Sequence, residues 1–237
     1  MLRLAGRAAR KIALLREERE LRRIRRRYAD FTMVPERNAV ANLLLCRRLA
    51  PASGCVVECG VWRGGMSAAM AEVLPGRLHY LFDSFEGLPP ATEADGPAAF
   101  AYQADTAAPA YFDNCRAGRA SAERAMRMSP ARRHELVQGW FEDTLPGFAP
   151  EEPVAVLRLD GDWYESTLRC LEALYPAVAP GGLVVLDDYY QWDGCARAVH
   201  EYLARRAEPA RIREFHGVAF LVKPAPAGGT PAGRGGA

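Results

Sequence analysis

Apolar residues recur along this chain in two patterns, as short unbroken runs and as longer stretches with helical spacing. An unbroken run is typical of a strand in a parallel sheet, because such a strand is covered on both faces and has no polar side. Runs that are apolar except for single polar residues lie at 55–59, 78–83, 154–160 and 183–187, and a shorter strand pattern lies at 135–138. Helical spacing lies at 35–49, 65–74, 166–178 and 194–206. The alternation predicts an α/β domain with a doubly wound, mostly parallel sheet.

Two further strand patterns, at 212–215 and 218–222, close this domain. Only His216 and Gly217 separate them. A parallel pair needs a crossover connection of a dozen or more residues, so these two strands are expected to be antiparallel neighbours. The sequence therefore predicts a seven-stranded sheet that is parallel except for a C-terminal hairpin.

The chain is expected to divide into three parts. Residues 1–30 predict a basic amphipathic helix, whose apolar stripe consists of Leu14, Leu21, Ile24 and Tyr28. Residues 31–223 form the α/β domain, and within it 88–134 is too long for a plain loop, so we expect a lid or helical insertion that selects the substrate. The Pro- and Gly-rich tail, 224–237, is expected to be disordered.

Positive charge is concentrated in the first 30 residues, which hold eleven Lys and Arg against four acids, whereas the whole chain has a formal net charge of +2. The basic residues thus lie away from the sheet, which argues against a nucleic-acid substrate. No apolar run approaches the roughly 20 residues that span a bilayer, so we expect no stable membrane insertion. Six cysteines without zinc spacing are typical of a reduced, cytoplasmic protein, and the Ala-, Arg- and Gly-rich composition resembles that of bacterial proteins.

Two predicted strands run directly into aspartates, one into Asp160 and the other into Asp187 and Asp188. The carboxyl ends of parallel strands share one edge of a sheet, so these three side chains should meet. Crowded carboxylates need a cation, a shared proton or wide spacing. A ligand set made only of oxygen favours a hard ion, Mg²⁺ first. Asp162 is a candidate base nearby, or else a helix cap or a partner of Arg158.

A glycine turn, Gly60-Val61-Trp62-Arg63-Gly64-Gly65, follows the first strand. Such a turn lets a nucleotide-like cofactor approach the backbone and the start of the next helix. NAD and other dinucleotides need G-x-G-x-x-G, and this spacing differs. Glu58 would repel a pyrophosphate and suits the ammonium group of S-adenosylmethionine (SAM), unless it only pairs with Arg63. Asp83 suits the ribose of either cofactor, unless it is a helix cap or a turn residue.

A third strand end leads into Gly139, Trp140 and Phe141. The backbone here and the Trp140 ring are placed to flank an adenine. A buried tryptophan that belongs only to the core is the alternative.

Several long motifs resemble the macrocin O-methyltransferase family. They are TMVPER at 32–37, ECGVWRGG at 58–65, DSFEGLP at 83–89, LRLDGDWYEST at 157–167 and PGG leading to DDY at 180–189. The resemblance covers about residues 30–222. It implies the Rossmann-like class I SAM-dependent methyltransferase fold, with SAM and Mg²⁺ as cofactors and a sugar hydroxyl as methyl acceptor.

The resemblance also implies a role for each site residue by position. Cofactor contacts would come from Thr32, Met33, Glu58, Gly60, Val61, Ser67, Asp83, Ser84, Gly139, Trp140 and Phe141. Mg²⁺ would be held by Asp160, Asp187 and Asp188, as in catechol O-methyltransferases. Where those enzymes carry a lysine base, this chain has Trp163, so the base stays open between Asp160, Asp162 and water.

Three other functions remain compatible with these residues. The acceptor of the methyl group is a catechol or another small diol in the first, and the chain is a non-catalytic SAM-fold scaffold in the second. An NAD-type oxidoreductase is the third, against which the filled glycine turn argues. The resemblance further implies a homo-oligomer, a dimer or a tetramer, with the N-terminal helix as mediator.

Overall fold

The computed structural model describes residues 2–225, and side chains from residue 12 onward. Seven strands form one sheet in the order β3-β2-β1-β4-β5-β7-β6. They are β1 (Cys55–Cys59), β2 (Leu78–Asp83), β3 (Arg133–Gln138), β4 (Val154–Leu159), β5 (Val178–Leu186), β6 (Arg213–Phe215) and β7 (Val218–Val222). Neighbouring strands are parallel except where β7 pairs with β5 and β6. The predicted sheet and its antiparallel hairpin are confirmed.

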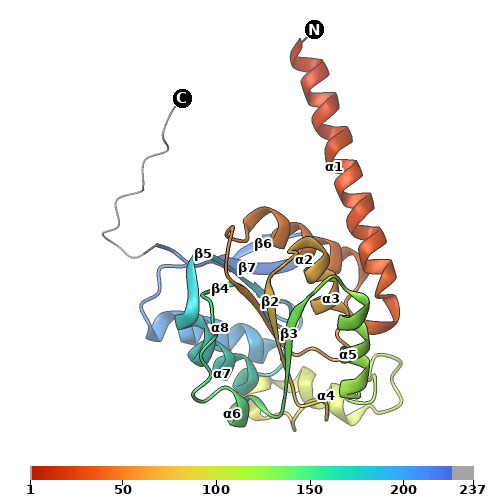
Figure 1. Cartoon of the computed structure of the whole chain (residues 1–237). Helices are drawn as coiled ribbons and strands as arrows, with labels where there is room; N and C mark the ends of the chain where they lie inside the picture. The colour runs from red at the N-terminus through yellow and green to blue at the C-terminus, as the bar shows by residue number, and fades with distance from the viewer. Residues whose placement is uncertain (1, 226–237) are drawn as a thin grey trace.

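Helices cover both faces of this sheet (Figure 1). They are α1 (Leu2–Arg27), α2 (Glu36–Leu49), α3 (Gly65–Val73), α4 (Pro97–Ala104), α5 (Arg119–Met128), α6 (Phe141–Thr144), α7 (Tyr164–Leu174) and α8 (Asp193–Arg205). One core lies between the sheet and α1, α2, α3 and α5, and the other lies between the sheet and α7 and α8. Alternate residues of each strand enter opposite cores, as Val56 and Val57 of β1 do, because successive side chains of a strand point to opposite faces.

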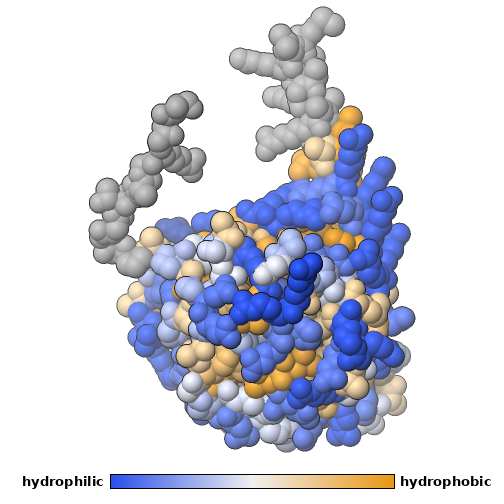
Figure 2. Space-filling model, in the orientation of Figure 1, coloured by the Kyte–Doolittle hydropathy of each residue, from blue (hydrophilic) through white to orange (hydrophobic). Residues whose placement is uncertain are grey.

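The long helix α1 belongs to the body only through its second half. Leu21, Ile24 and Tyr28 are buried against α2 and α3, as the stripe predicted. Leu14, the fourth residue of that stripe, is 44% exposed, because the helix has already left the body at that point (Figure 1). The described surface of α1 is largely hydrophilic, with apolar atoms at its outer end (Figure 2). No described helix is long and apolar enough to cross a membrane.

The boundary between α7 and β5 differs from the sequence-based prediction. The helix ends at Leu174, a 3-10 turn covers Tyr175–Ala177, and β5 already begins at Val178. Val178 pairs with Val154, and pairing resumes only between Leu183 and Val156, so β5 bulges between its two paired ends. The Pro-Gly-Gly sequence inside this bulge hid the early strand, since Pro and Gly are rare in strand interiors.

The segment 88–134, predicted as a lid or helical insertion, contains a 3-10 turn at Glu93–Asp95 together with α4 and α5. Asp95 ties this segment to the sheet domain. Its buried carboxylate accepts hydrogen bonds from the backbone N–H of Thr92 (2.7 Å) and from that of Tyr164 (2.6 Å), at the start of α7. The role of the segment 88–134 as a lid stays a prediction. The disorder of the tail, 224–237, also stays a prediction, because residues 226–237 lie outside the described residues.

Candidate functional site

A cavity of about 480 Å³ lies at the carboxyl ends of β1, β2, β4 and β5. Its walls bring together nearly all the residues proposed from sequence: Thr32, Met33, Glu58, Gly60, Val61, Asp83, Ser84, Gly139, Trp140, Phe141, Asp160, Asp162, Asp187 and Asp188. Ser67 is the exception, because it lies buried behind Glu58. Cavities of this size are typical of small-molecule sites.

The glycine turn after β1 is held in shape by Asp83. The Oδ2 atom of Asp83 accepts the backbone N–H groups of Val61 (2.7 Å) and Trp62 (2.8 Å), and Oδ1 accepts that of Phe85 (2.6 Å). Gly60 has a φ of +85°, and a Cβ there would lie 1.8 Å from the carbonyl oxygen of Asp160, so no other residue fits. Burial raises the pKa of Asp83, and these three donors oppose the rise. Asp83 is thus also a turn residue.

Glu58 lies at the end of β1, below this turn. The Ser67 hydroxyl donates a hydrogen bond to its carboxylate, and Nη1 of Arg158 lies 2.7 Å from its Oε1 atom. Burial raises the pKa of Glu58, and the charge of Arg158 lowers it. The alternative that Glu58 pairs with Arg63 is wrong, because the Arg63 guanidinium stacks over the Trp62 ring at 4.3 Å instead.

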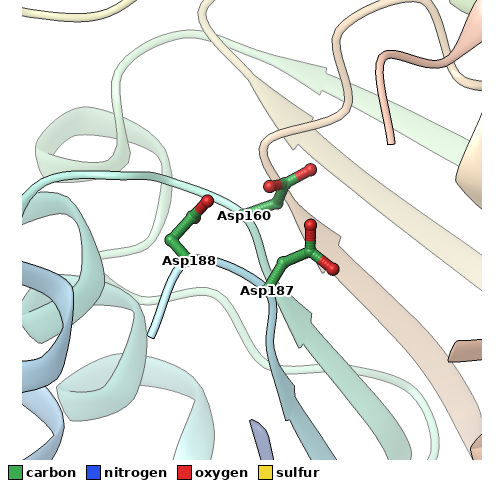
Figure 3. Close-up of side chains that lie close together, drawn as sticks. All are labelled: Asp160, Asp187 and Asp188. Atoms are coloured by element: carbon green, nitrogen blue, oxygen red, sulfur yellow. The ribbon is translucent and has the colours of Figure 1, made fainter. Parts of the chain in front are cut away.

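Asp160, Asp187 and Asp188 meet at the ends of β4 and β5, and Figure 3 shows their side chains grouped there. Each contributes one carboxylate oxygen to a set in which all oxygens lie within 4.8 Å of one another. Clustered carboxylate oxygens are the ligands that hard divalent ions such as Mg²⁺ prefer. Burial raises the pKa of Asp160 and of Asp188, and neighbouring carboxylates add to both shifts. The cluster therefore fits a divalent cation.

Asp162 stands beside this cluster rather than in it. Its Oδ1 atom accepts the indole N–H of Trp192 (2.7 Å), and its backbone N–H donates to Oδ2 of Asp188 (3.0 Å). Burial raises the pKa of Asp162 to about 7, with the Asp187 charge adding to the rise and Trp192 opposing it. The alternative roles, a cap of α7 or a partner of Arg158, are not what the contacts show, since Asp95 accepts the first N–H of α7.

Arg158 and Asn42 are the site residues that sequence reasoning missed. Arg158 was considered only as a possible partner of Asp162, although a charged residue in a strand buried on both faces needs a partner of its own. Its guanidinium lies 2.7 Å from Asp160 and 3.0 Å from Asp187. Asn42, from α2, donates to Oδ1 of Asp187 (3.1 Å) and accepts from Nε of Arg158 (3.3 Å).

Aromatic side chains from several segments form part of the cavity wall. Tyr102 and Trp192 pack edge to face there, and Phe112 lines the cavity while 51% exposed. Residues 112–115 all have positive φ, between 48° and 60°, a conformation that costs about 1–2 kcal/mol per residue outside glycine. Trp163, at the position of the lysine base in catechol enzymes, is fully buried and donates to the carbonyl of Pro89 (2.9 Å). It anchors the 88–134 segment to the sheet domain.

The profile of the family described as macrocin-O-methyltransferase (TylF) matches residues 31–221. A tetracenomycin-C rhamnosyl 4'-O-methyltransferase of Streptomyces olivaceus is 40% identical over 190 residues, which cover 74% of this chain and 69% of that protein. Mycinamicin III 3''-O-methyltransferase of Micromonospora griseorubida is 36% identical over 170 residues, 68% of this chain and 65% of that protein. The matched part thus spans about two thirds of these relatives.

Solved structures share the fold. The O-methyltransferase NovP is 30% identical, with a TM-score of 0.66 over 82% of this chain and 83% of that chain. The calicheamicin methyltransferase CalS11 is 24% identical, with a TM-score of 0.55 over 84% of this chain and 91% of that chain. The expected class I methyltransferase fold is confirmed.

Proposed function

Because the chain belongs to the macrocin-O-methyltransferase family, we propose that it transfers the methyl group of SAM to a sugar hydroxyl of a glycosylated natural product, with Mg²⁺ as a second cofactor. One observation supports this proposal above the others. A single cavity has a glycine turn with Glu58 and Asp83 on one side and a cluster of three aspartates on the other.

The first side suits the cofactor. Glu58 would bind the ammonium group of the methionine end, and the Ser67 hydroxyl fixes its carboxylate. Asp83 keeps lone pairs for the ribose while it holds the turn, and Ser84 lies beside it in the cavity wall. The 139–141 backbone would flank the adenine, and Thr32 and Met33 would close the cavity. SAM supplies an activated methyl group to this arrangement.

The second side suits the acceptor. Asp160, Asp187 and Asp188 would hold Mg²⁺, which supplies Lewis acidity that lowers the pKa of a hydroxyl and fixes its position. Asp162 is the base that we favour over Asp160, since Trp192 occupies its Oδ1 atom and leaves Oδ2 for the proton. A base whose pKa is about 7 is well matched to neutral pH. Phe112 and Tyr102 would contact the apolar parts of the acceptor.

Calorimetric titration with S-adenosylhomocysteine, with and without Mg²⁺, tests the cofactor, and NAD⁺ is the control. We expect micromolar binding of the homocysteine compound and none of NAD⁺. Methyl transfer is then measured on glycosides with vicinal hydroxyls and, in parallel, on catechols. Turnover of catechols alone would replace the sugar by the small-diol alternative. Absence of homocysteine-compound binding in both buffers would contradict the methyltransferase proposal and favour a scaffold.

We also propose a cytoplasmic homo-oligomer, a dimer or a tetramer. The exposed apolar residues in the middle of α1, namely Ile12, Leu14 and Leu15, support the assembly, and the six free cysteines support a reducing compartment. Light scattering of the full chain and of a variant with these three residues changed to Ser measures the state. An unchanged mass would contradict a role for α1.

A further inference from the structure

The side chain of Arg158 links the two sides of the cavity. It is 1% exposed, and its Nη1 atom lies 2.7 Å from Oε1 of Glu58 and 2.7 Å from Oδ2 of Asp160. Its Nη2 atom lies 3.0 Å from Oδ2 of Asp187. One planar guanidinium thus contacts a carboxylate assigned to the cofactor and two carboxylates assigned to the metal. Arginine is suited to this, because its fork of fixed donors bonds several carboxylate oxygens at once.

Negative charge dominates around this group. Among the described residues that line the cavity, Arg158 is the one cation, whereas the acids are Glu58, Asp83, Glu142, Asp160, Asp162, Asp187 and Asp188. Buried carboxylates without a counter-charge cost several kcal/mol each. The guanidinium therefore compensates part of the charge, and the acids that it leaves over make the cavity attract a further cation.

Asn42 fixes the geometry of this contact without adding charge. Its amide bridges Oδ1 of Asp187 and Nε of Arg158, and α2 holds it fully buried. Asp187 thereby has both oxygens in contact with protein groups, which hold its carboxylate in place.

We propose that Arg158 is a positioning residue, an internal counter-cation that keeps the cofactor and metal carboxylates assembled when no ion is bound. This inference rests on the proposed metal-dependent function. Mg²⁺ and Arg158 would then compensate the same carboxylates, Asp160 and Asp187. Removal of the arginine should make the fold depend on the ion, whereas in the wild type the ion is an exchangeable reagent.

The test compares the thermal midpoint with and without saturating Mg²⁺ in wild type and Arg158→Gln. Without Mg²⁺ we expect Arg158→Gln to melt well below the wild type. Mg²⁺ should raise its midpoint by about twice the wild-type rise or more, since the ion binds a site from which a competing cation has gone. Arg158→Lys keeps the positive charge but loses the planar guanidinium with its several donors. We expect Mg²⁺ to raise its thermal midpoint by an amount between those of the wild type and Arg158→Gln.

Two controls separate charge from packing. Arg77→Gln removes an arginine that is half-buried and donates to backbone carbonyls, including that of Gly54 (3.2 Å). Arg77 precedes the first residue of β2, at the edge of the sheet opposite to the strand ends that carry the aspartates. Asn42→Ala removes a neutral member of the Arg158 contact. Arg77→Gln should melt lower than the wild type and show the wild-type rise in Mg²⁺. Asn42→Ala should also melt lower, with a rise no larger than that of the wild type, because it loosens the Asp187 ligand and removes no competing cation.

Each outcome of these experiments either supports or overturns the inference. An Arg158→Gln rise equal to or smaller than the wild-type rise, with Mg²⁺ binding to the wild type shown by calorimetry, overturns the inference alone. Absence of Mg²⁺ binding to the wild type overturns the metal proposal and the inference together. If Arg158→Gln folds only when Mg²⁺ is present, the inference is supported. If Arg158→Gln folds neither with nor without Mg²⁺, the test moves to Arg158→Lys. A rise of its thermal midpoint in Mg²⁺ that is no larger than the wild-type rise then overturns the inference.

Discussion

The two sides of the cavity use strand-end carboxylates in opposite ways. On the cofactor side, Asp83 accepts three backbone N–H groups, so its charge is compensated by the turn that it organises. On the metal side, Asp160, Asp187 and Asp188 face one another, and one guanidinium contacts only two of them. A carboxylate that accepts backbone N–H groups stabilises the fold. Carboxylates that face one another leave negative charge uncompensated, which attracts a cationic ligand.

This comparison predicts that an acid removed from each side has a different effect on stability. Asp188→Asn should lower kcat by about a hundredfold or more, because a metal ligand is lost at the reacting hydroxyl. Its thermal midpoint without Mg²⁺ should not fall, since repulsion among the aspartates is relieved. Steady-state rates and melting curves measure both. Full rate with normal Mg²⁺ dependence would contradict the three-carboxylate site.

Asp83→Ala should lower stability, which Asp188→Asn should not. Three backbone donors lose their acceptor, so the fold is destabilised, and the glycine turn no longer presents its backbone to the cofactor. We expect affinity for S-adenosylhomocysteine to fall by about 10- to 100-fold, as hydrogen bonds to charged groups contribute about 1.5–3 kcal/mol. Calorimetry and urea unfolding measure the two losses. Weaker binding with unchanged stability would show that Asp83 acts on the ribose alone.

Trp192→Phe sharpens the comparison within the metal side. The loss of one hydrogen bond to Asp162 should reduce kcat about tenfold, since a bond to a charged group contributes about 1.5 kcal/mol. Affinity for S-adenosylhomocysteine should not change. Trp163→Phe is the matched control, because that ring packs on Trp192 at 5.0 Å but donates to Pro89, and it should lower stability more than kcat. Equal kcat losses in both variants would argue against Asp162 as the base.

Ser67→Ala is expected to have the smallest effect. Glu58 loses a neutral donor but keeps Arg158, so affinity for S-adenosylhomocysteine should fall about threefold with kcat unchanged. Calorimetry beside steady-state rates separates the two quantities. A loss of kcat without a loss of affinity would place Glu58 on the metal side.

Much of this arrangement follows from sequence, for a physical reason. The ends of parallel strands converge, so Glu58, Asp83, Asp160 and Asp187 had to meet once their runs were recognised as strands. The turn after β1 could also be recognised from its glycines, but the contact that requires Gly60, with the carbonyl oxygen of Asp160, is visible only in the structure.

Contacts between distant elements could not be read in this way. Arg158 sits inside an apolar run, and nothing local tells that its partner is Asn42 on a helix 116 residues earlier. Asp95 lies in a segment with no clear periodicity, and its contact with the start of α7 depends on how that segment folds back. Periodicity predicts which face of a helix or strand is buried, but it does not predict which polar group of another element that face contacts.

The distance in sequence between Glu58 and Arg158 has a consequence for synthesis. The two residues are 100 positions apart, and β1 lies between β2 and β4 in the sheet. A ribosome completes β1 and β2 long before the arginine is made, and β3 ends 20 residues before it. Until then Glu58 of the nascent chain lacks its partner Arg158, and β1 can pair with β2 but not with β4. The order of translation therefore delays assembly of the cavity until the second half of the chain has been made.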